Sequence, residues 1–126
     1  MFHLTVKKII EIQTRIIDTS LIIGDEGTGG IIRDLGTLDY IVSKLDIYHS
    51  PIEKSAWILL SISSMYPSYQ GNKRTALEAA QMLLYFNNDG SIISGNPEKI
   101  NEFVREISVG KYDIKEIIEW ITSQLL

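Results

Sequence analysis

The sequence predicts an all-α fold. Apolar residues recur at a spacing of three or four along most of the 126 residues, and Pro, Gly, Asn and Asp mark the breaks between these stretches. Several of the stretches begin with a side chain that can accept a hydrogen bond from a helix start. The chain contains no repeat, no low-complexity tract and no linker long enough to separate domains. We therefore expect one all-α domain over residues 1–126.

The first half of the chain predicts three helices. Thr5 can cap the first one, whose apolar face consists of isoleucines: Ile9, Ile10, Ile12, Ile16 and Ile17. A glycine-rich loop over 24–30 follows, and its flanks, 21–23 and 31–32, could be short strands or extended arms. A second helix is expected from Thr37 to just before Tyr48. The third has the strongest start signal, since Ser50 and Glu53 form a capping box around Pro51, and it should end near Ser64.

Three more helices are predicted in the second half. The fourth should run from Asn72 to Asn87, and its broad apolar face predicts that it is the buried central helix. Asn96-Pro97 starts the fifth helix, and Gly110 stands just past its end. Asp113 and Glu116 form a second possible capping box, which opens the sixth. Trp57 and Trp120 lie at helical spacing among apolar neighbours, which indicates core positions.

Composition limits the function classes. Hydrophobic residues make up 44% of the chain, as in globular proteins. The net charge is −4 and the basic residues are spread along the chain, which argues against nucleic acid as a partner. Without cysteine, disulfides, thiolate nucleophiles and Cys-ligated metals are excluded. No apolar run reaches membrane-spanning length and the N-terminus lacks a signal-peptide pattern, so we expect a cytoplasmic protein with no membrane partner.

The stretch from Gly71 to Arg74 has the composition of an anion site. Gly71 gives backbone freedom and Asn72 a short polar side chain at the start of a helix, where free N–H groups and the helix dipole favour a phosphate. Lys73 and Arg74 add positive charge, and the planar fork of an arginine can hold two phosphate oxygens. The four residues therefore predict a phosphate- or nucleotide-binding site.

Residues 66–76 read Tyr-Pro-Ser-Tyr-Gln-Gly-Asn-Lys-Arg-Thr-Ala. This stretch resembles the signature of the Fic/Doc (Fido) family in its Doc-like, death-on-curing branch, His-Pro-Phe-x-Asp/Glu-Gly-Asn-Lys-Arg-Thr-Ala. Pro67 and the run 71–76 match without gaps, and in outline the resemblance covers roughly residues 3 to 125. Tyr66 stands at the position of the family's catalytic His, and Gln70 at that of its acidic residue.

The resemblance implies a transferase site in which the His takes a proton from a hydroxyl on a target protein. That hydroxyl attacks a nucleotide phosphate such as that of ATP, while the acidic residue holds Mg²⁺. By resemblance, Gly71 to Arg74 keep the phosphate role. A phenol has a pKa near 10, so Tyr66 is a poor replacement for an imidazole base. Gln70 offers Mg²⁺ a neutral amide in place of a carboxylate, so the chain itself predicts no metal site.

Three functions stay open. The first is a Doc/Fic-like domain that binds a phosphate or nucleotide and is a weak or inactive toxin-type transferase. The second is an active Doc-like phosphotransferase or nucleotidyltransferase, with Tyr66 or a neighbour recruited as base. His49, just before the Ser50 cap, is a further candidate for a displaced base. The third is a non-enzymatic toxin–antitoxin module. The family's inhibitory pattern, Ser/Thr-x-x-x-Glu-Gly/Asn, is missing from the sequence, so any inhibition would come from an antitoxin or another protein partner.

Overall fold

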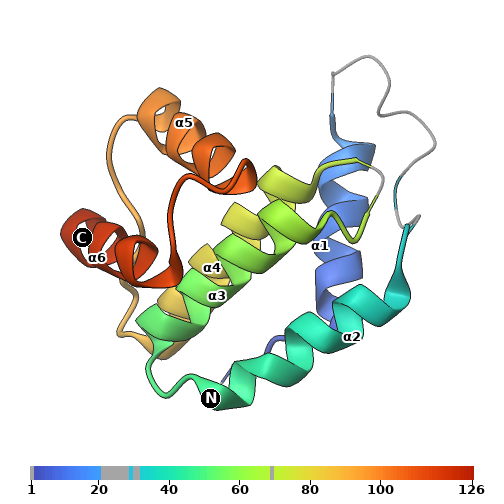
Figure 1. The fold of residues 1–126 in the computed structure, drawn as a ribbon, viewed down its shortest axis with the longest axis horizontal. Helices are drawn as coiled ribbons and strands as arrows, with labels where there is room; N and C mark the ends of the chain where they lie inside the picture. Colours follow the sequence, from blue (N-terminus) through green and yellow to red (C-terminus); the bar gives the residue numbers. More distant parts are fainter. Residues whose placement is uncertain (1, 21–28, 30–31, 69) are drawn as a thin grey trace.

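The computed structural model describes residues 2–20, 29, 32–68 and 70–126, and in these residues it is all-α, as the sequence predicts. Within these described ranges, six α-helices and one 3₁₀ helix account for the regular structure, with no strand (Figure 1). Two isolated antiparallel bridges join Ile32 with Ser68 and Ile93 with Leu125. The elements are α1 (Val6–Asp18), α2 (Leu35–Ser43), η1 (Lys44–Ile47), α3 (Pro51–Met65), α4 (Asn72–Asn87), α5 (Pro97–Ser108) and α6 (Ile114–Gln124).

The helix starts are set by side-chain caps. Thr5 caps α1 and Asn96 caps α5, and both predicted capping boxes are formed, at the starts of α3 and α6. The start of α2, predicted near Thr37, lies two residues earlier. The side chain of Asp34 accepts a hydrogen bond from the Thr37 N–H, so the helix begins at Leu35. The side chain of Thr37 and then its backbone N–H, both hydrogen-bonded to the Asp34 carboxylate, lower the pKa of Asp34.

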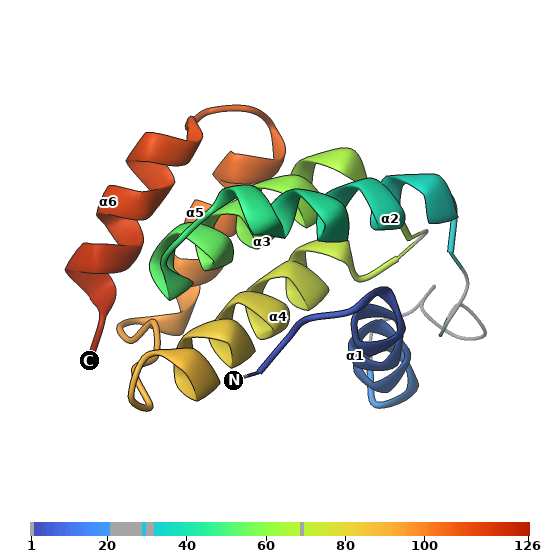
Figure 2. The same ribbon diagram turned by 90° about the horizontal axis from the view of Figure 1, so that it is seen from below.

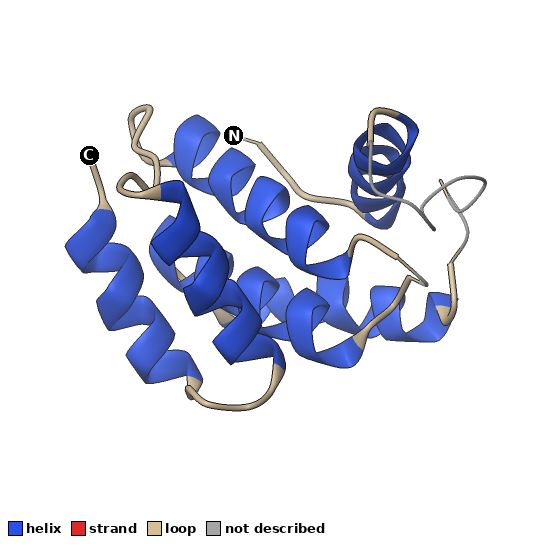
Figure 3. Cartoon of the chain, turned by 90° about the horizontal axis from the view of Figure 1, so that it is seen from above, coloured by secondary structure: helices blue, strands red, loops and turns tan. Residues whose placement is uncertain are grey.

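Two antiparallel helices, α3 and α4, run side by side through the middle of the molecule (Figures 1 and 2). The sequence predicted α4 as the central helix, and in the structure α3 shares this central position. α4 contacts α1, α3 and α5, whereas α3 contacts α2, α4, α5 and α6, so the two form a central pair. Figure 3 shows the remaining helices arranged around this pair, with α1 at one end and α6 at the other.

Small side chains let α3 and α4 approach closely. Ser55 on α3 is fully buried, and its hydroxyl donates to the backbone carbonyl of Ala80 on α4 at 3.1 Å. A side chain with one carbon therefore spans the gap between the two backbones. Ala76, Ala79 and Ala80 of α4 are all fully buried. This packing fixes the position of the loop that joins the two helices.

The rest of the core is aliphatic with aromatic stacks at its edges. Ile9 and Ile12 of α1 and Ile117 and Ile121 of α6 are buried. Trp57 is 8% exposed and donates its indole N–H to the carbonyl of Ile41 at 2.8 Å. Trp120 is half-buried and stacks on Phe103, with ring centroids 4.0 Å apart. Trp57 thus belongs to the core, as predicted, whereas Trp120 packs against its edge.

Two further sequence predictions concern the glycine-rich loop and membrane-spanning segments. The glycine-rich loop over 24–30 and its flanks lie almost wholly outside the described residues, apart from residues 29 and 32. Among the described helices, none has the length and apolarity needed to cross a membrane.

The close approach of the central pair predicts a steric penalty at Ala80. An Ala80→Leu substitution adds three carbons against the α3 backbone and should lower the free energy of unfolding by about 1–3 kcal/mol, measured by urea denaturation. Lys115→Leu on the exposed face of α6 is the control and should change it by about 0.5 kcal/mol or less. Equal losses in the two variants would show that α3 and α4 are not closely packed at this point.

Candidate anion-binding site

The candidate site is built on the loop between α3 and α4, residues 66–71, which we call the motif loop. Residue 69 lies outside the described residues. The loop begins at Tyr66 and ends at Gly71, and both have left-handed backbone conformations, with φ of 50° and 76°. For a tyrosine this conformation costs roughly 1–2 kcal/mol, so surrounding contacts must hold it. For Gly71 the φ itself carries little cost, and a Cβ there would lie 3.1 Å from Ile17 Cδ1.

The segment before α2 holds the first half of the motif loop. The guanidinium of Arg33 donates from Nε to the carbonyl of Tyr66 at 3.0 Å. The backbone N–H groups of Arg33 and Asp34 both donate to the carbonyl of Pro67, at 2.8 and 3.1 Å. Next to them, Ile32 forms its bridge with Ser68. These contacts hold the left-handed Tyr66 and fix where α3 ends.

Two side chains hold the second half of the motif loop. The amide of Asn72 donates to the carbonyl of Ser68 at 2.8 Å and accepts from the Ser68 N–H at 3.0 Å. Gln13 of α1 donates from Nε2 to the carbonyl of Gln70 at 3.1 Å. Asn72 was predicted to offer its side chain to a phosphate, and the structure instead uses this side chain to shape the loop. What Asn72 can still give a ligand is its backbone N–H.

The start of α4 is built differently from the other helix starts in the described part of the chain. The side chains of Thr5, Asp34, Ser50, Asn96 and Asp113 cap the other five α-helices, whereas Gly71 provides no side-chain cap. A left-handed residue followed by helical ones turns successive N–H groups into a concave, anion-binding arrangement. The helix dipole adds partial positive charge at the same end.

Lys73 and Arg74 extend this positive region into a groove of about 720 Å³ between α1, α4 and α5. Lys73 is exposed and Arg74 is half-buried, with its Nη1 3.3 Å from the hydroxyl of Ser20. The groove also has apolar walls and further charged side chains: Ile16, Leu77, Glu78, Glu98, Asn101, Glu102, Val104 and Arg105. The structure therefore brings all four predicted phosphate residues to one helix start, with the two basic side chains lining a cavity.

The two residues at the family's catalytic positions are placed less favourably. Tyr66 is 39% exposed, and its hydroxyl donates to the carbonyl of Ser108 at the end of α5, at 3.1 Å. This bond uses the proton that a general base would need to have lost. The side chain of Gln70 is exposed. No group of three or more His, Cys, Asp or Glu side chains in the described residues is arranged to hold a metal ion.

The distant candidate base, His49, is too far away. It stands just before α3, whereas Tyr66 caps the other end of that helix. Fifteen helical residues separate them, about 22 Å along the axis. His49 lines a different cavity, of about 390 Å³, together with His3. Neither histidine can act on a ligand bound at the start of α4.

The sequence analysis did not identify two residues that hold the motif loop. Arg33 stands 33 positions before the Tyr66 carbonyl that it contacts, and nothing in its neighbourhood indicates that pairing. Gln13 did leave a signal. It lies at helical spacing within the isoleucine face of α1, between Ile9 and Ile17, and it is fully buried. A buried polar side chain needs a partner, and that partner is the motif loop.

Comparison with known proteins adds no family: no protein-family model and no curated protein matches this chain. The Fic/Doc resemblance therefore rests on the sequence pattern alone.

The hydrogen bonds of Asn72 predict its main effect on stability. Asn72→Ala leaves the backbone N–H and carbonyl of Ser68, which is 4% exposed, without these two partners. The free energy of unfolding should fall by about 1–3 kcal/mol, and exchange of the Ser68 amide hydrogen should become faster. Asn101→Ala on the exposed face of α5 should do neither. Unchanged exchange at Ser68 would contradict the role given to Asn72.

Proposed function

We propose that this protein is a Doc-like relative of the Fic/Doc family that binds the phosphate of a nucleotide at the start of α4. We further propose that it is a weak or inactive protein-modifying transferase. One observation carries the binding part. The left-handed Gly71 opens α4 without a side-chain cap, beside a groove into which Lys73 and Arg74 extend. Backbone N–H groups, the helix dipole and two cationic side chains thus favour the same ligand charge.

The groove supports a nucleotide such as ATP in preference to phosphate alone. Its volume of about 720 Å³ exceeds what a phosphate needs. Leu77 and Val104 offer apolar surface for a base, and the carboxylates of Glu98 and Glu102 can accept hydrogen bonds from hydroxyl or amino groups. Mg²⁺ is no part of this proposal, because Gln70 gives it no carboxylate.

The weak-catalysis part rests on Tyr66 and Gln70. A general base typically contributes about 10²–10⁴ in rate, and the Tyr66 hydroxyl is engaged as a donor to Ser108. A metal anchor of the family's kind is lacking at Gln70. Binding and catalysis are thereby separated: the phosphate-binding half of the motif is kept, and the half that would do chemistry is replaced.

The same groove supports a second candidate, an interaction module that receives a segment of an antitoxin or another protein. Apolar side chains and charges of both signs line the groove: Lys73, Arg74 and Arg105 against Glu78, Glu98 and Glu102. A peptide with mixed charges and a few apolar side chains would be complementary to such walls. A nucleotide and a peptide would compete there, so nucleotide titrations with and without the partner would separate the two functions.

The binding proposal predicts a loss of affinity in Arg74→Ala. Removing one charge-assisted contact should weaken ATP and pyrophosphate by about 10- to 150-fold, equivalent to about 1.5–3 kcal/mol, measured by isothermal titration. Lys115→Ala removes one positive charge from the exposed face of α6 and should change the affinity by less than about twofold. If Arg74→Ala binds ATP as tightly as the parent, the phosphate role of this helix start is wrong.

The catalytic proposal predicts almost no transfer of label from α- or γ-labelled ATP to proteins of a cell lysate. The double variant Tyr66→His, Gln70→Asp restores a base and a metal ligand and should raise the transfer, by up to about 10²–10⁴ from the base alone. Adding Arg74→Ala to the double variant is the control and should lower the transfer again. Strong labelling by the unaltered chain would favour the active transferase instead.

A further inference from the structure

The peptide bond between Gln70 and Gly71 stands directly before α4, and its orientation decides where its C=O and N–H groups point. A trans peptide is planar, and its C=O and N–H point in opposite directions. The carbonyl of Gln70 is turned toward α1, where Gln13 donates to it at 3.1 Å. The Gly71 N–H is therefore directed away from α1.

The backbone of Gly71 alone does not fix the orientation of this peptide. Gly71 has a φ of 76°, and glycine occupies positive and negative φ with similar ease, so a flip of this peptide carries little cost from Gly71 itself. A flipped peptide would turn the Gln70 carbonyl to where the N–H had pointed, and a carbonyl oxygen repels an anion. The orientation must be held from outside the loop. In the described residues, the side chain that contacts this carbonyl comes from α1.

We propose that Gln13 is a positioning residue, which holds the Gln70–Gly71 peptide so that the Gly71 N–H faces an anion at the start of α4. Its effect on ligand affinity rests on the proposed function, whereas the orientation of the peptide can be measured without any ligand. The competence of the site is then linked to the position of α1, which carries Gln13 toward the motif loop or away from it.

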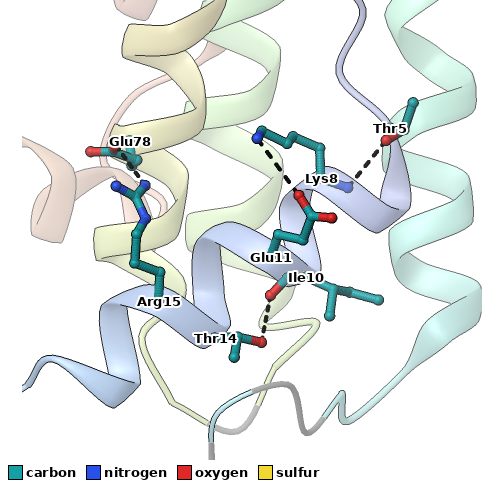
Figure 4. A network of polar contacts seen from close by, with 7 residues as sticks. All are labelled: Thr5, Lys8, Ile10, Glu11, Thr14, Arg15 and Glu78. Carbon is teal, nitrogen blue, oxygen red and sulfur yellow. Dashed lines mark hydrogen bonds and ion pairs between the residues drawn. The ribbon is translucent and has the colours of Figure 1, made fainter.

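Other contacts are sufficient to dock α1 itself. Arg15 pairs with Glu78 of α4 at 2.8 Å, further from the motif loop (Figure 4). Ile9, Ile12 and Ile17 are buried on the same face as Gln13. Loss of the Gln13 amide should therefore leave α1 in place and release the peptide. This separates a positioning role from a general structural one.

The chain offers a matched control in Gln81. It lies on α4, its Nε2 donates to the carbonyl of Ile93 at 2.9 Å, and its Oε1 accepts from the Ile93 N–H at 2.8 Å. Both glutamines thus hold the backbone of a distant segment through the side-chain amide. Gln81 does so more than two helical turns beyond the start of α4. Substituting either with Met removes the amide at similar volume.

The experiment compares the parent, Gln13→Met and Gln81→Met by nuclear magnetic resonance. The couplings of the Gly71 amide to its two α protons report φ in the free proteins, and a titration with inorganic pyrophosphate gives the affinity. Gln13→Met should change the couplings of Gly71 and weaken pyrophosphate by about tenfold, the worth of one hydrogen bond to a charged group. Gln81→Met should change neither, even where it lowers the melting temperature. Gln13→Asn keeps the amide but is one methylene too short, and it serves if Gln13→Met does not fold.

The outcomes are distinct. Unchanged Gly71 couplings in Gln13→Met overturn the inference, whatever the ligand does, and so does an equal effect of Gln81→Met. Changed couplings with unchanged pyrophosphate affinity overturn the link to binding while the proposed function stands. If the parent binds no pyrophosphate, the proposed function fails, and the Gly71 couplings still decide whether Gln13 orients the peptide.

Discussion

The close packing of α3 on α4 is the interaction on which the rest of this structure depends. The Ser55 hydroxyl of α3 donates to the Ala80 carbonyl of α4, and the buried alanines of α4 are small. The two helices can therefore shift little relative to each other. A short loop joins them at one end. Because both of its anchors are fixed, the motif loop has few ways to close, and the contacts of Arg33 and Gln13 select the one in which Tyr66 and Gly71 are left-handed.

The motif loop is further held by residues distant in the sequence. Arg33 and Asp34 bind the carbonyls near its beginning, and Gln13 binds the one near its end. Several of its carbonyl groups are thus engaged by the body of the protein. Because these carbonyl groups already have hydrogen-bond partners, the backbone groups that a ligand would meet at the start of α4 are N–H groups. Positive electrostatic character then comes from backbone geometry and dipole as much as from Lys73 and Arg74.

Binding and chemistry follow different physical requirements at this site. Binding a phosphate needs oriented N–H groups and nearby cations, which many sequences can supply once Gly71 sets the backbone. Transfer of a phosphoryl or nucleotidyl group needs in addition a base and charge neutralisation at fixed positions. The hydroxyl of Tyr66 is bound to the carbonyl of Ser108 at the end of α5. The position of the base therefore holds α5 instead of activating a hydroxyl.

The sequence alone determined the helices and the residues of the candidate site. Caps and apolar spacing are local, so the bounds of α4 and both capping boxes could be predicted from neighbouring residues, and Gly71 to Arg74 lie together because they are consecutive. The start of α2 was missed because Asp34 was not recognised as its cap. The turn of Asn72 toward Ser68, four positions away, is a local contact that was not predicted. Tertiary structure alone decided the roles of Gln13, Arg33 and Ser108. Those contacts join segments up to 57 positions apart, and their geometry exists only once the helices have packed.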